Sequence, residues 1–249
     1  MKANNYLISF EKVSLRYPQL YSSFSTLKDL VLHPSALFER HGHHEVLRDL
    51  SFSLRRGDRI GVLGINGSGK SSFLKLMARI LPPTTGEIRI AGKVLPLISF
   101  GAGFHPEMTG IENVMFLSLL HGRHPRETGA AMDKIAAFAD IGDYLSSPVR
   151  TYSDGMRSRL AFALAASLPF DVLLIDEVLA VGDGRFQQKC IEWLRGIDWT
   201  QKALVLVSHD LRLIEALTAQ AIWLSDGRIA SNGVSPGMVY SYKQWLGLV

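Results

Sequence analysis

The sequence carries, at residues 64–71, the run Gly64-Ile65-Asn66-Gly67-Ser68-Gly69-Lys70-Ser71, which fits the phosphate-binding loop pattern G-x-x-x-x-G-K-[ST] at every fixed position. Residues 59–63 before it are short and apolar, as in a buried parallel strand. Apolar residues after it recur at helical spacing, namely Phe73, Leu74, Met77, Ile80 and Leu81. The alternative is a glycine-rich turn before an ordinary helix. Because strand and helix are both in place, the order predicts a nucleotide-binding loop.

The glycines of this loop remove side chains where the backbone must curl around an anion. Consecutive N–H groups and the positive end of the helix dipole then point at the β-phosphate of a nucleotide. We expect the Lys70 ammonium to reach the β- and γ-phosphates and the Ser71 hydroxyl to ligate Mg²⁺. The residues expected to contact the nucleotide are Gly64, Asn66, Gly67, Ser68, Gly69, Lys70, Ser71 and Ser72.

The composition describes a globular protein that can bury a substantial core. The chain has 249 residues, of which 47% are hydrophobic and 20% charged. Its net charge is only +4, and no basic run is longer than Arg55-Arg56. We therefore expect no nucleic-acid partner, although the charge is compatible with a mild attraction to anionic membrane surfaces. The single cysteine, Cys190, excludes an internal disulfide, suits a reducing cytosol and is expected to pack in a helix. Because no secretion signal and no run of ~18 apolar residues occurs, we expect the chain neither to enter the secretory path by itself nor to span a bilayer.

The N-terminal part of the chain has the alternation of β-strands. Residues 6–17 and 46–54 alternate and predict strands of an antiparallel patch. Residues 18–45 contain an irregular insertion, in which Leu27, Leu30 and Val31 make a short apolar stripe. This stripe fits either a lid packed on its own domain or a helix that faces a partner or a membrane.

The rest of the chain predicts further strands around a helical region. Two strands are expected within residues 87–99, and the periodic segments 111–120 and 127–141 are helical and belong to an inserted lobe over residues 101–168. Two tight apolar strands, 172–175 and 203–207, resume a sheet that is covered by helices on both faces. A hairpin at residues 221–232 follows, and then a closing helix for which Ser235 is the expected cap and Pro236 the opening residue.

Three further places carry candidate chemistry. Ser153 and Gly155 stand at a predicted helix start, where unpaired N–H groups make a second anion site, although the same residues can be an ordinary N-cap. Asp176 and Glu177 end a buried strand, where open α/β sheets bind ligands. We expect Asp176 to hold Mg²⁺ and Glu177 to polarise the attacking water, the alternative being a surface acidic pair. His209, also at a strand end, fits a contact with the γ-phosphate or its water, or a structural histidine.

These motifs in this order resemble the ATP-binding subunit of an ABC transporter, over nearly the whole chain. In that family, residues 64–71 are the Walker A loop, residues 153–156 the signature, and residues 172–176 the Walker B strand, which is followed by Glu177 as catalytic base. The resemblance implies ATP and Mg²⁺ as ligands.

The resemblance also implies roles for three single residues. Asp183 matches the loop at the dimer interface, and His209 matches the switch histidine. Tyr17 fits by position the aromatic residue that stacks on adenine, with packing of the first strand as the equal alternative.

Two departures from the family pattern affect the expected site. Asp154 and Met156 replace the Gly and Gln of most signatures, so a carboxylate stands beside a phosphate site and should weaken ATP binding unless it points away. The usual glutamine of the loop before the helical lobe is missing, and Ser99 or Phe100 stands there. We therefore expect no magnesium ligand in that loop.

Three local features narrow the resemblance. Residues 100–107 (FGAGFHPE), the Tyr-Ser-x-Gly-Met signature and residues 176–183 (DEVLAVGD) look like the ATPases of bacterial polysaccharide exporters for O-antigen, capsule or teichoic acid chains. The insertion at residues 18–45 is also similar to that subfamily, where an N-terminal helix lies near the membrane subunit.

The expected fold is therefore α/β, a P-loop NTPase with a mostly parallel core sheet, an antiparallel β patch and an inserted helical lobe. It forms one ABC ATPase domain over residues 1–249, with the insertion at 18–45, the lobe at 101–168, and the hairpin and helix at 221–249. The expected function is ATP hydrolysis that powers export of a polysaccharide or lipid-linked glycan.

The expected partners follow from the same resemblance. We expect a homodimer that sandwiches ATP and binds two copies of an integral-membrane permease subunit, at the cytoplasmic face of the inner membrane. One helix follows the hairpin, so this chain need not contact the glycan. Two rival functions are a soluble ABC ATPase acting on nucleic acid or ribosomes, and a nucleotide-gated regulator that rarely turns ATP over. The base at Glu177 argues against the regulator.

Overall fold

The computed structural model describes residues 6–18, 42–97, 103–176 and 183–248. The predictions that concern the stripe of the insertion, the loop at Ser99 and Phe100, and the catalytic base Glu177 lie outside the described residues. Among the residues that are described, no helix is both long and apolar enough to cross a membrane.

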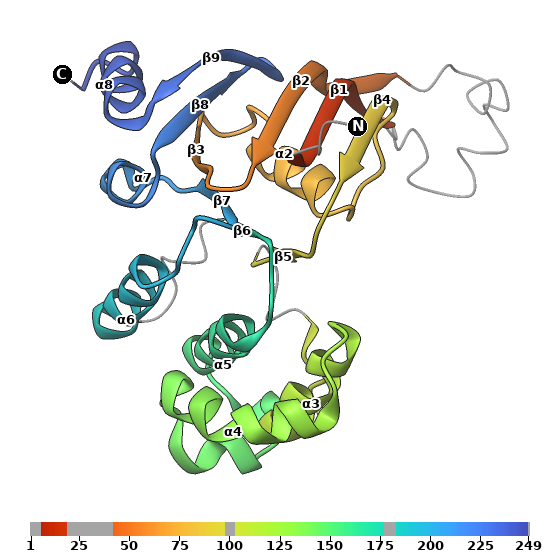
Figure 1. The fold of residues 1–249 in the computed structure, drawn as a ribbon, viewed down its shortest axis with the longest axis vertical. Coiled ribbons are helices and arrows are strands. Elements are labelled where there is room, and N and C mark those ends of the chain that lie inside the picture. Colours follow the sequence, from red (N-terminus) through yellow and green to blue (C-terminus); the bar gives the residue numbers. More distant parts are fainter. Residues whose placement is uncertain (1–5, 19–41, 98–102, 177–182, 249) are drawn as a thin grey trace, which may run out of the picture.

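The first sheet is the antiparallel patch that the sequence predicts (Figure 1). Its three strands are β1 (Tyr6–Pro18), β2 (His43–Arg55) and β4 (Thr85–Ile90), and β1 lies in the middle and pairs antiparallel with both neighbours. Because β2 begins at His43, residues 43–45 belong to this strand, and the predicted end of the insertion at residue 45 was wrong.

The second sheet has six strands in the order β5-β6-β7-β3-β8-β9. They are β5 (Val94–Pro96), β6 (Val172–Asp176), β7 (Ala203–Val207), β3 (Arg59–Leu63), β8 (Gln220–Ser225) and β9 (Arg228–Val234). All neighbouring pairs are parallel except β8 and β9, which form the predicted antiparallel hairpin. The core sheet is therefore mostly parallel, as predicted.

The continuous apolar runs of the central strands fill two hydrophobic clusters, one on each face of the sheet. Alternate residues such as Leu174 and Val205 join a cluster with helix α2 (Lys70–Met77) and the antiparallel sheet. Their neighbours, such as Leu173 and Leu204, join a cluster with α6 (Gly184–Arg195), α7 (Leu211–Leu217) and α8 (Ser235–Trp245). This alternation follows from the two-residue period of a strand and explains why these segments carry no polar face.

The helical lobe, defined here as residues 103–168, lies between β5 and β6 in the chain and extends away from the antiparallel sheet (Figure 1). It contains α3 (Gly110–Leu120), α4 (Pro125–Ala139), the short 3₁₀ turns η3 (Gly142–Ser146) and η4 (Val149–Thr151), and α5 (Asp154–Ser167). Residues 160–165 of α5 are all buried and join the lobe to the cluster that also holds α6. The predicted inserted lobe is thus confirmed as a set of helices.

Two predicted helix details were wrong. Helix α2 ends at Met77, and Ile80 lies beyond it with 52% of its surface exposed. Ser235 does not cap α8, because its hydroxyl lies 3.0 Å from that of Thr218 and Val234 occupies the cap position without a side-chain hydrogen bond. Cys190 is buried in α6, which confirms its packing role.

Candidate nucleotide-binding site

The loop between β3 and α2 has the geometry that its glycines predict. Gly64 has φ +154°, and a Cβ atom there would lie 2.5 Å from Ser68 Oγ and 2.6 Å from the Leu224 carbonyl oxygen. Gly69 has φ +100°, and its Cβ would lie 2.6 Å from Leu47 Cδ2. At both positions the backbone conformation and the close neighbours exclude larger residues. The loop therefore forms a cradle that side chains would fill.

The positive groups of the cradle are in place. Lys70 is buried, and its Nζ donates hydrogen bonds to the carbonyl oxygens of Gly64 (2.7 Å) and Ile65 (2.9 Å). The ammonium is thus held inside the curl of the loop. Gly69 occupies the N-cap of α2 and no side chain caps the helix, whose first turn has no acidic residue. This leaves the first N–H groups of α2 for an anion.

One buried hydroxyl of the loop also fits a bound phosphate. Ser68 Oγ is buried and has no hydrogen-bond partner among the described residues. A buried polar atom without a partner costs free energy, so its place within a phosphate-binding pattern indicates that a ligand completes it. Asn66 and Gly67 are exposed at the mouth of the loop, Ser71 is exposed in the first turn of α2, and the next residue, Ser72, is half-buried.

Three predicted groups, namely the phosphate-binding loop, His209 and Asp176, lie at the carboxyl ends of neighbouring strands of the core sheet. Strands β3, β7 and β6 are adjacent, and Val62, Val207 and Asp176 are paired across them in register. The phosphate-binding loop, His209 and Asp176 thus follow the carboxyl ends of three neighbouring parallel strands, where ligands bind in such sheets. Asp176 is half-buried and His209 is exposed.

Two hydrogen bonds between side chains and backbone amides fix the backbone around His209. Ser208 Oγ accepts a hydrogen bond from the Asp210 amide, and the Asp210 side chain caps α7 through the Arg212 amide. His209 therefore sits in a short turn between the end of β7 and the first turn of α7. An exposed position in this turn differs from that of a structural histidine buried in a core.

The predicted second helix start is confirmed at α5. Ser153 is its exposed N-cap, and Ser153 Oγ accepts a hydrogen bond from the Met156 amide at 3.2 Å. The side chain of Asp154 is 91% exposed and pairs with Arg157 on the next turn. A Cβ atom on Gly155 would meet only Ser153 Oγ, at 3.8 Å. The space over the helix start is thus open, and the Asp154 carboxylate points into solvent.

The residue just before this helix start, Tyr152, is fixed by buried contacts. Tyr152 is 5% exposed, and its Oη donates a hydrogen bond to the Tyr144 carbonyl oxygen at 2.5 Å. Burial raises the pKa of this phenol, and the Gly110 amide partly opposes the shift. Gly110 is the first residue of α3, and a Cβ atom there would lie 2.3 Å from Tyr152 Oη.

The structure brings Tyr17 to the nucleotide loop. Tyr17 is half-buried near the end of β1, with its Oη 3.4 Å from Ser72 Oγ in the first turn of α2, and it packs against the hydrophobic cluster that contains α2. The predicted packing role is therefore present. Stacking on adenine stays a prediction.

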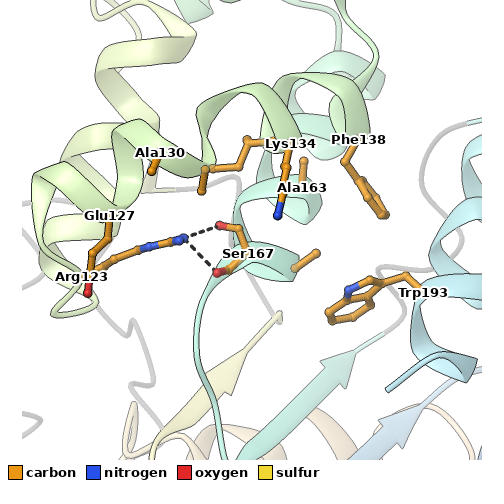
Figure 2. Close-up of a pocket in the computed structure, with 11 residues that line it drawn as sticks. Arg123, Glu127, Ala130, Lys134, Phe138, Ala163, Ser167 and Trp193 are labelled. Carbon is orange, nitrogen blue, oxygen red and sulfur yellow. Dashed lines mark hydrogen bonds between the residues drawn. The ribbon is translucent and has the colours of Figure 1, made fainter. Parts of the chain in front are cut away.

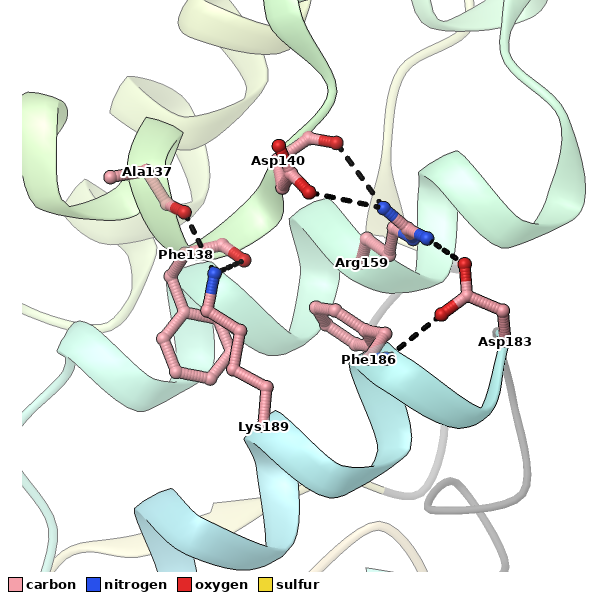
Figure 3. Close-up of polar contacts among 7 residues, drawn as sticks. All are labelled: Ala137, Phe138, Asp140, Arg159, Asp183, Phe186 and Lys189. Carbon is pink, nitrogen blue, oxygen red and sulfur yellow. Dashed lines mark hydrogen bonds and ion pairs between the residues drawn. The ribbon is translucent and has the colours of Figure 1, made fainter.

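Asp183 has two structural partners in the described chain. One carboxylate oxygen caps α6 by accepting from the Phe186 amide at 2.9 Å, and the other pairs with Arg159 of α5 (Figure 3). The Phe186 amide, and then the Arg159 charge, lower the pKa of this carboxyl group. Sequence patterns did not indicate Arg159, because its partners lie far away in the chain.

A separate pocket of about 470 Å³ lies between α4, α5 and α6 (Figure 2). Phe138 and Trp193 form an apolar wall, and Lys134 points into the pocket. Arg123 donates hydrogen bonds to the carbonyl oxygen and the hydroxyl of Ser167. This pocket is amphipathic and lies outside the phosphate-binding loop.

The fold and the loop define a class of protein, a nucleotide-binding α/β cassette with an inserted helical lobe. The ABC transporter family profile matches residues 47–180. The O-antigen export system ATP-binding protein RfbB of Klebsiella pneumoniae is 35% identical over 240 residues, which cover 96% of this chain and 98% of that protein. The teichoic acids export ATP-binding protein TagH of Listeria monocytogenes serotype 4b is 36% identical over 242 residues, 97% of this chain and 71% of that protein.

Solved structures agree on the fold. A dimeric ATP-binding cassette in a post-hydrolysis state, bound to ADP and Pi, superposes with a TM-score of 0.73 at 18% identity and covers 92% of this chain and 98% of that one. An ATP-binding subunit of an ABC transporter gives a TM-score of 0.74 at 19% identity, over 97% of this chain and 94% of that one. This chain belongs to the ABC transporter family and is an ATP-binding ABC ATPase.

Proposed function

We propose that this chain is the ATP-hydrolysing subunit of an ABC transporter that exports a polysaccharide or a lipid-linked glycan across the cytoplasmic membrane. The Lys70 ammonium held inside the loop, over an otherwise uncapped helix, supports ATP as the energy source. The long matches to subunits named for O-antigen and teichoic acid export support a glycan as the transported molecule. In this proposal residues 1–249 act as one ABC ATPase domain.

The residues around the loop have distinct roles in this proposal. Lys70 binds the β- and γ-phosphates, and Glu177 takes the proton of the attacking water while His209 contacts the γ-phosphate or that water. The Ser71 hydroxyl and the Asp176 carboxylate are oxygen donors of the kind that Mg²⁺ takes, together with phosphate and water. The ion would neutralise charge that develops between the β- and γ-phosphates.

The proposal includes a homodimer in which each ATP lies between Lys70 of one chain and Ser153 of the other. The open space over Gly155 and the outward direction of Asp154 support an approach of phosphate to this helix start. The γ-phosphate is then the link that holds the dimer closed. Hydrolysis removes this link and lets the dimer reopen.

We also propose that two copies of a membrane permease bind the helical lobes, which places this chain at the cytoplasmic face of the inner membrane. Phe116, Leu119 and Leu120 of α3 are exposed at 44%, 55% and 66%, and they offer apolar surface to such a partner. The amphipathic pocket with Trp193 lies between α4, α5 and α6, and none of these three residues lines it (Figure 2). The glycan itself need not touch this chain.

A substitution of the proposed base tests the enzymatic part. Glu177→Gln keeps the shape and the hydrogen bonding of the side chain but removes the base, so turnover should fall by ~10²–10⁴-fold while ATP binding stays. The variant should accumulate as an ATP-bound dimer in gel filtration. Lys70→Ala is the matched control, because it should remove ATP binding itself. Normal turnover by Glu177→Gln would show that another group is the base.

Mixed dimers test the composite site. Lys70→Ala and Ser153→Arg should each be inactive alone, because the first removes the charge aimed at the phosphates and the second blocks the helix start. When the two chains are co-expressed with different tags and purified through both tags, both lesions fall in one site and the other site is intact. Half of the wild-type amount of trapped ATP per dimer is therefore expected. No trapped nucleotide at all would mean that each site uses Lys70 and Ser153 of the same chain.

A further inference from the structure

The side chain of Asn113, in helix α3, is polar but fully buried. Its Oδ1 accepts a hydrogen bond from the His105 amide at 2.7 Å. Its Nδ2 donates to the carbonyl oxygens of His105 (3.1 Å), Met108 (3.1 Å) and Thr109 (2.9 Å). One carboxamide therefore binds the backbone at both ends of the segment 105–109, which we call the 105–109 loop.

Asparagine suits this position because its planar carboxamide offers one acceptor and two donors on a short side chain. The three carbonyl oxygens also accept hydrogen bonds from backbone amides, whereas the His105 amide has Asn113 Oδ1 as its acceptor. The side chains of His105, Pro106 and Glu107 are exposed, so burial of apolar surface does little to fix this loop. The backbone of the loop is instead fixed from inside the lobe, by Asn113.

The 105–109 loop pairs in turn with the segment that leads to α5. The Val149 amide donates a hydrogen bond to the Met108 carbonyl oxygen at 3.0 Å, and the Arg150 amide donates to that of Pro106 at 2.9 Å. The two segments also form an antiparallel bridge. The segment before α5 thus takes its position from the loop, and the loop takes its position from α3.

Only two residues separate Arg150 from Ser153, the N-cap of α5. One of them is Tyr152, whose amide donates a hydrogen bond to the Val149 carbonyl oxygen at 3.0 Å, at the end of the 3₁₀ turn η4. The structure describes every residue from 103 to 153, so the path from α3 to this N-cap runs through defined backbone contacts. The helix start is therefore held from the side of the loop as well as by the Tyr152 hydroxyl.

We propose that Asn113 is a positioning residue for the ATP that the partner subunit binds. By fixing the 105–109 loop, it fixes the segment before α5 and hence the place of the Ser153 hydroxyl and of the first N–H groups of α5. The inference rests on the proposed function, in which this helix start approaches the γ-phosphate of an ATP held by Lys70 of the other chain. All hydrogen bonds of the Asn113 side chain in the described structure lie within the lobe, so its loss should spare nucleotide binding by the loop of its own chain.

The first test compares matched variants of the full chain. Asn113→Ala should leave the Kd for ADP within about twofold, because ADP needs only the Lys70 loop of its own chain, but should lower the ATP trapped per dimer by at least about tenfold. Arg123→Met is the control, since it removes two hydrogen bonds to Ser167 at the other end of α5. It should lower the urea midpoint and leave the trapped ATP near the wild-type amount. Equal loss of trapping in the two variants would show that any damage to the lobe has this effect and would overturn the proposal.

Mixed dimers show which ATP the Asn113 side chain serves. With a Lys70→Ala chain, the Asn113→Ala chain should trap half of the wild-type amount of ATP per dimer, because both lesions affect one site and the other site is intact. With a Ser153→Arg chain, it should trap at most about a tenth of the wild-type amount, since each site then carries one lesion. Trapping with the Ser153→Arg chain, or equal loss in both mixtures, would contradict a role at the partner's ATP.

A second test needs no ATP and separates this inference from the proposed function. In amide hydrogen exchange, Val149 and Arg150 should exchange as slowly as the middle of α3 in the wild type, and at least about tenfold faster in Asn113→Ala, while the end of α5 stays unchanged. Asn113→Asp, which keeps the size and the acceptor for the His105 amide, takes its place if the alanine variant does not fold.

Unprotected amides at Val149 and Arg150 in the wild type, or equal acceleration over the whole lobe, would refute the positioning role. A different result would refute the proposed function, namely a reference mixture of Lys70→Ala and Ser153→Arg chains that traps no ATP. The exchange rates would then still decide whether Asn113 fixes the helix start.

Discussion

The contact between Gly110 and Tyr152 allows a quantitative test of how the Ser153 helix start is held. A Cβ atom on residue 110 would lie 2.3 Å from Tyr152 Oη and 3.0 Å from the Leu145 carbonyl oxygen. The phenol cannot retreat without losing its hydrogen bond to Tyr144. Overpacking of this kind costs about 1–3 kcal/mol, and loss of the hydrogen bond about 1 kcal/mol. We therefore expect Gly110→Ala to reduce the free energy of unfolding by roughly 2–4 kcal/mol.

Removing the hydroxyl separates the two contributions. Tyr152→Phe removes one of two donors to the Tyr144 carbonyl oxygen, which keeps the Ser147 amide as its partner. The change should cost at most about 1 kcal/mol, but it makes room for a methyl group at residue 110. In urea unfolding, the double variant should be at least about 1 kcal/mol more stable than the sum of the single effects predicts. Because Ser153 follows Tyr152 directly, ATPase activity should fall in Gly110→Ala and partly recover in the double variant. Additive stability changes would refute this account of Gly110.

Three further predictions concern other parts of the chain. Asp154→Asn removes only an exposed pair with Arg157, so the KM for ATP should change less than about threefold in a steady-state ATPase assay; a large decrease would mean that the carboxylate faces the nucleotide. Burial raises the pKa of the Cys190 thiol to about 12, whereas an unfolded thiol titrates near 8.5. The native thiol should therefore resist thiol reagents at pH 8 and react on unfolding, and its stabilising effect should be complete below about pH 8.5 and be lost as the pH rises towards 12. Deleting most of residues 19–41 should leave the ATPase rate of the purified chain intact but reduce surface polysaccharide in cells, whereas an unfolded variant would place the stripe of this segment in the core of its own domain.

The strands and the phosphate-binding loop could be predicted because their signals are local. Strands β6 and β7 are continuous apolar runs, and such runs fit only a sheet that is covered on both faces. The loop is set by glycines at fixed spacing, and the structure requires glycine at Gly64 and Gly69 through backbone φ and close neighbours. At Gly64 and Gly69 the residue type that defines the sequence motif is also the one that the backbone conformation requires.

The wrong details depend on contacts that a local pattern does not contain. Ile80 continues the helical spacing of α2, but the helix ends at Met77 and Arg79 takes a left-handed conformation with φ +55°. Ser235 precedes a proline and has the residue type of a cap, yet its hydroxyl is used by Thr218 from another helix end. No local pattern indicates Arg159, because its contacts are with Asp140 and Asp183, which only folding brings close to it.

Helix α5 has a solvent-exposed N-terminus, but the residues just before and after this N-terminus are fixed by contacts with the rest of the chain. Ser153 and Asp154 are exposed, whereas Tyr152 is anchored in the lobe and Arg159 is tied to α6. In the proposed dimer, Ser153 meets a phosphate that is bound by the other chain. This contact would be weaker if Ser153 had to be ordered at the moment of contact, because ordering costs conformational entropy. Here the ordering is already present in the single chain, since buried contacts define the position of the helix start. In the proposed dimer, closure would then be limited by whether ATP is present on the facing loop, which is the condition that the proposed transport cycle requires.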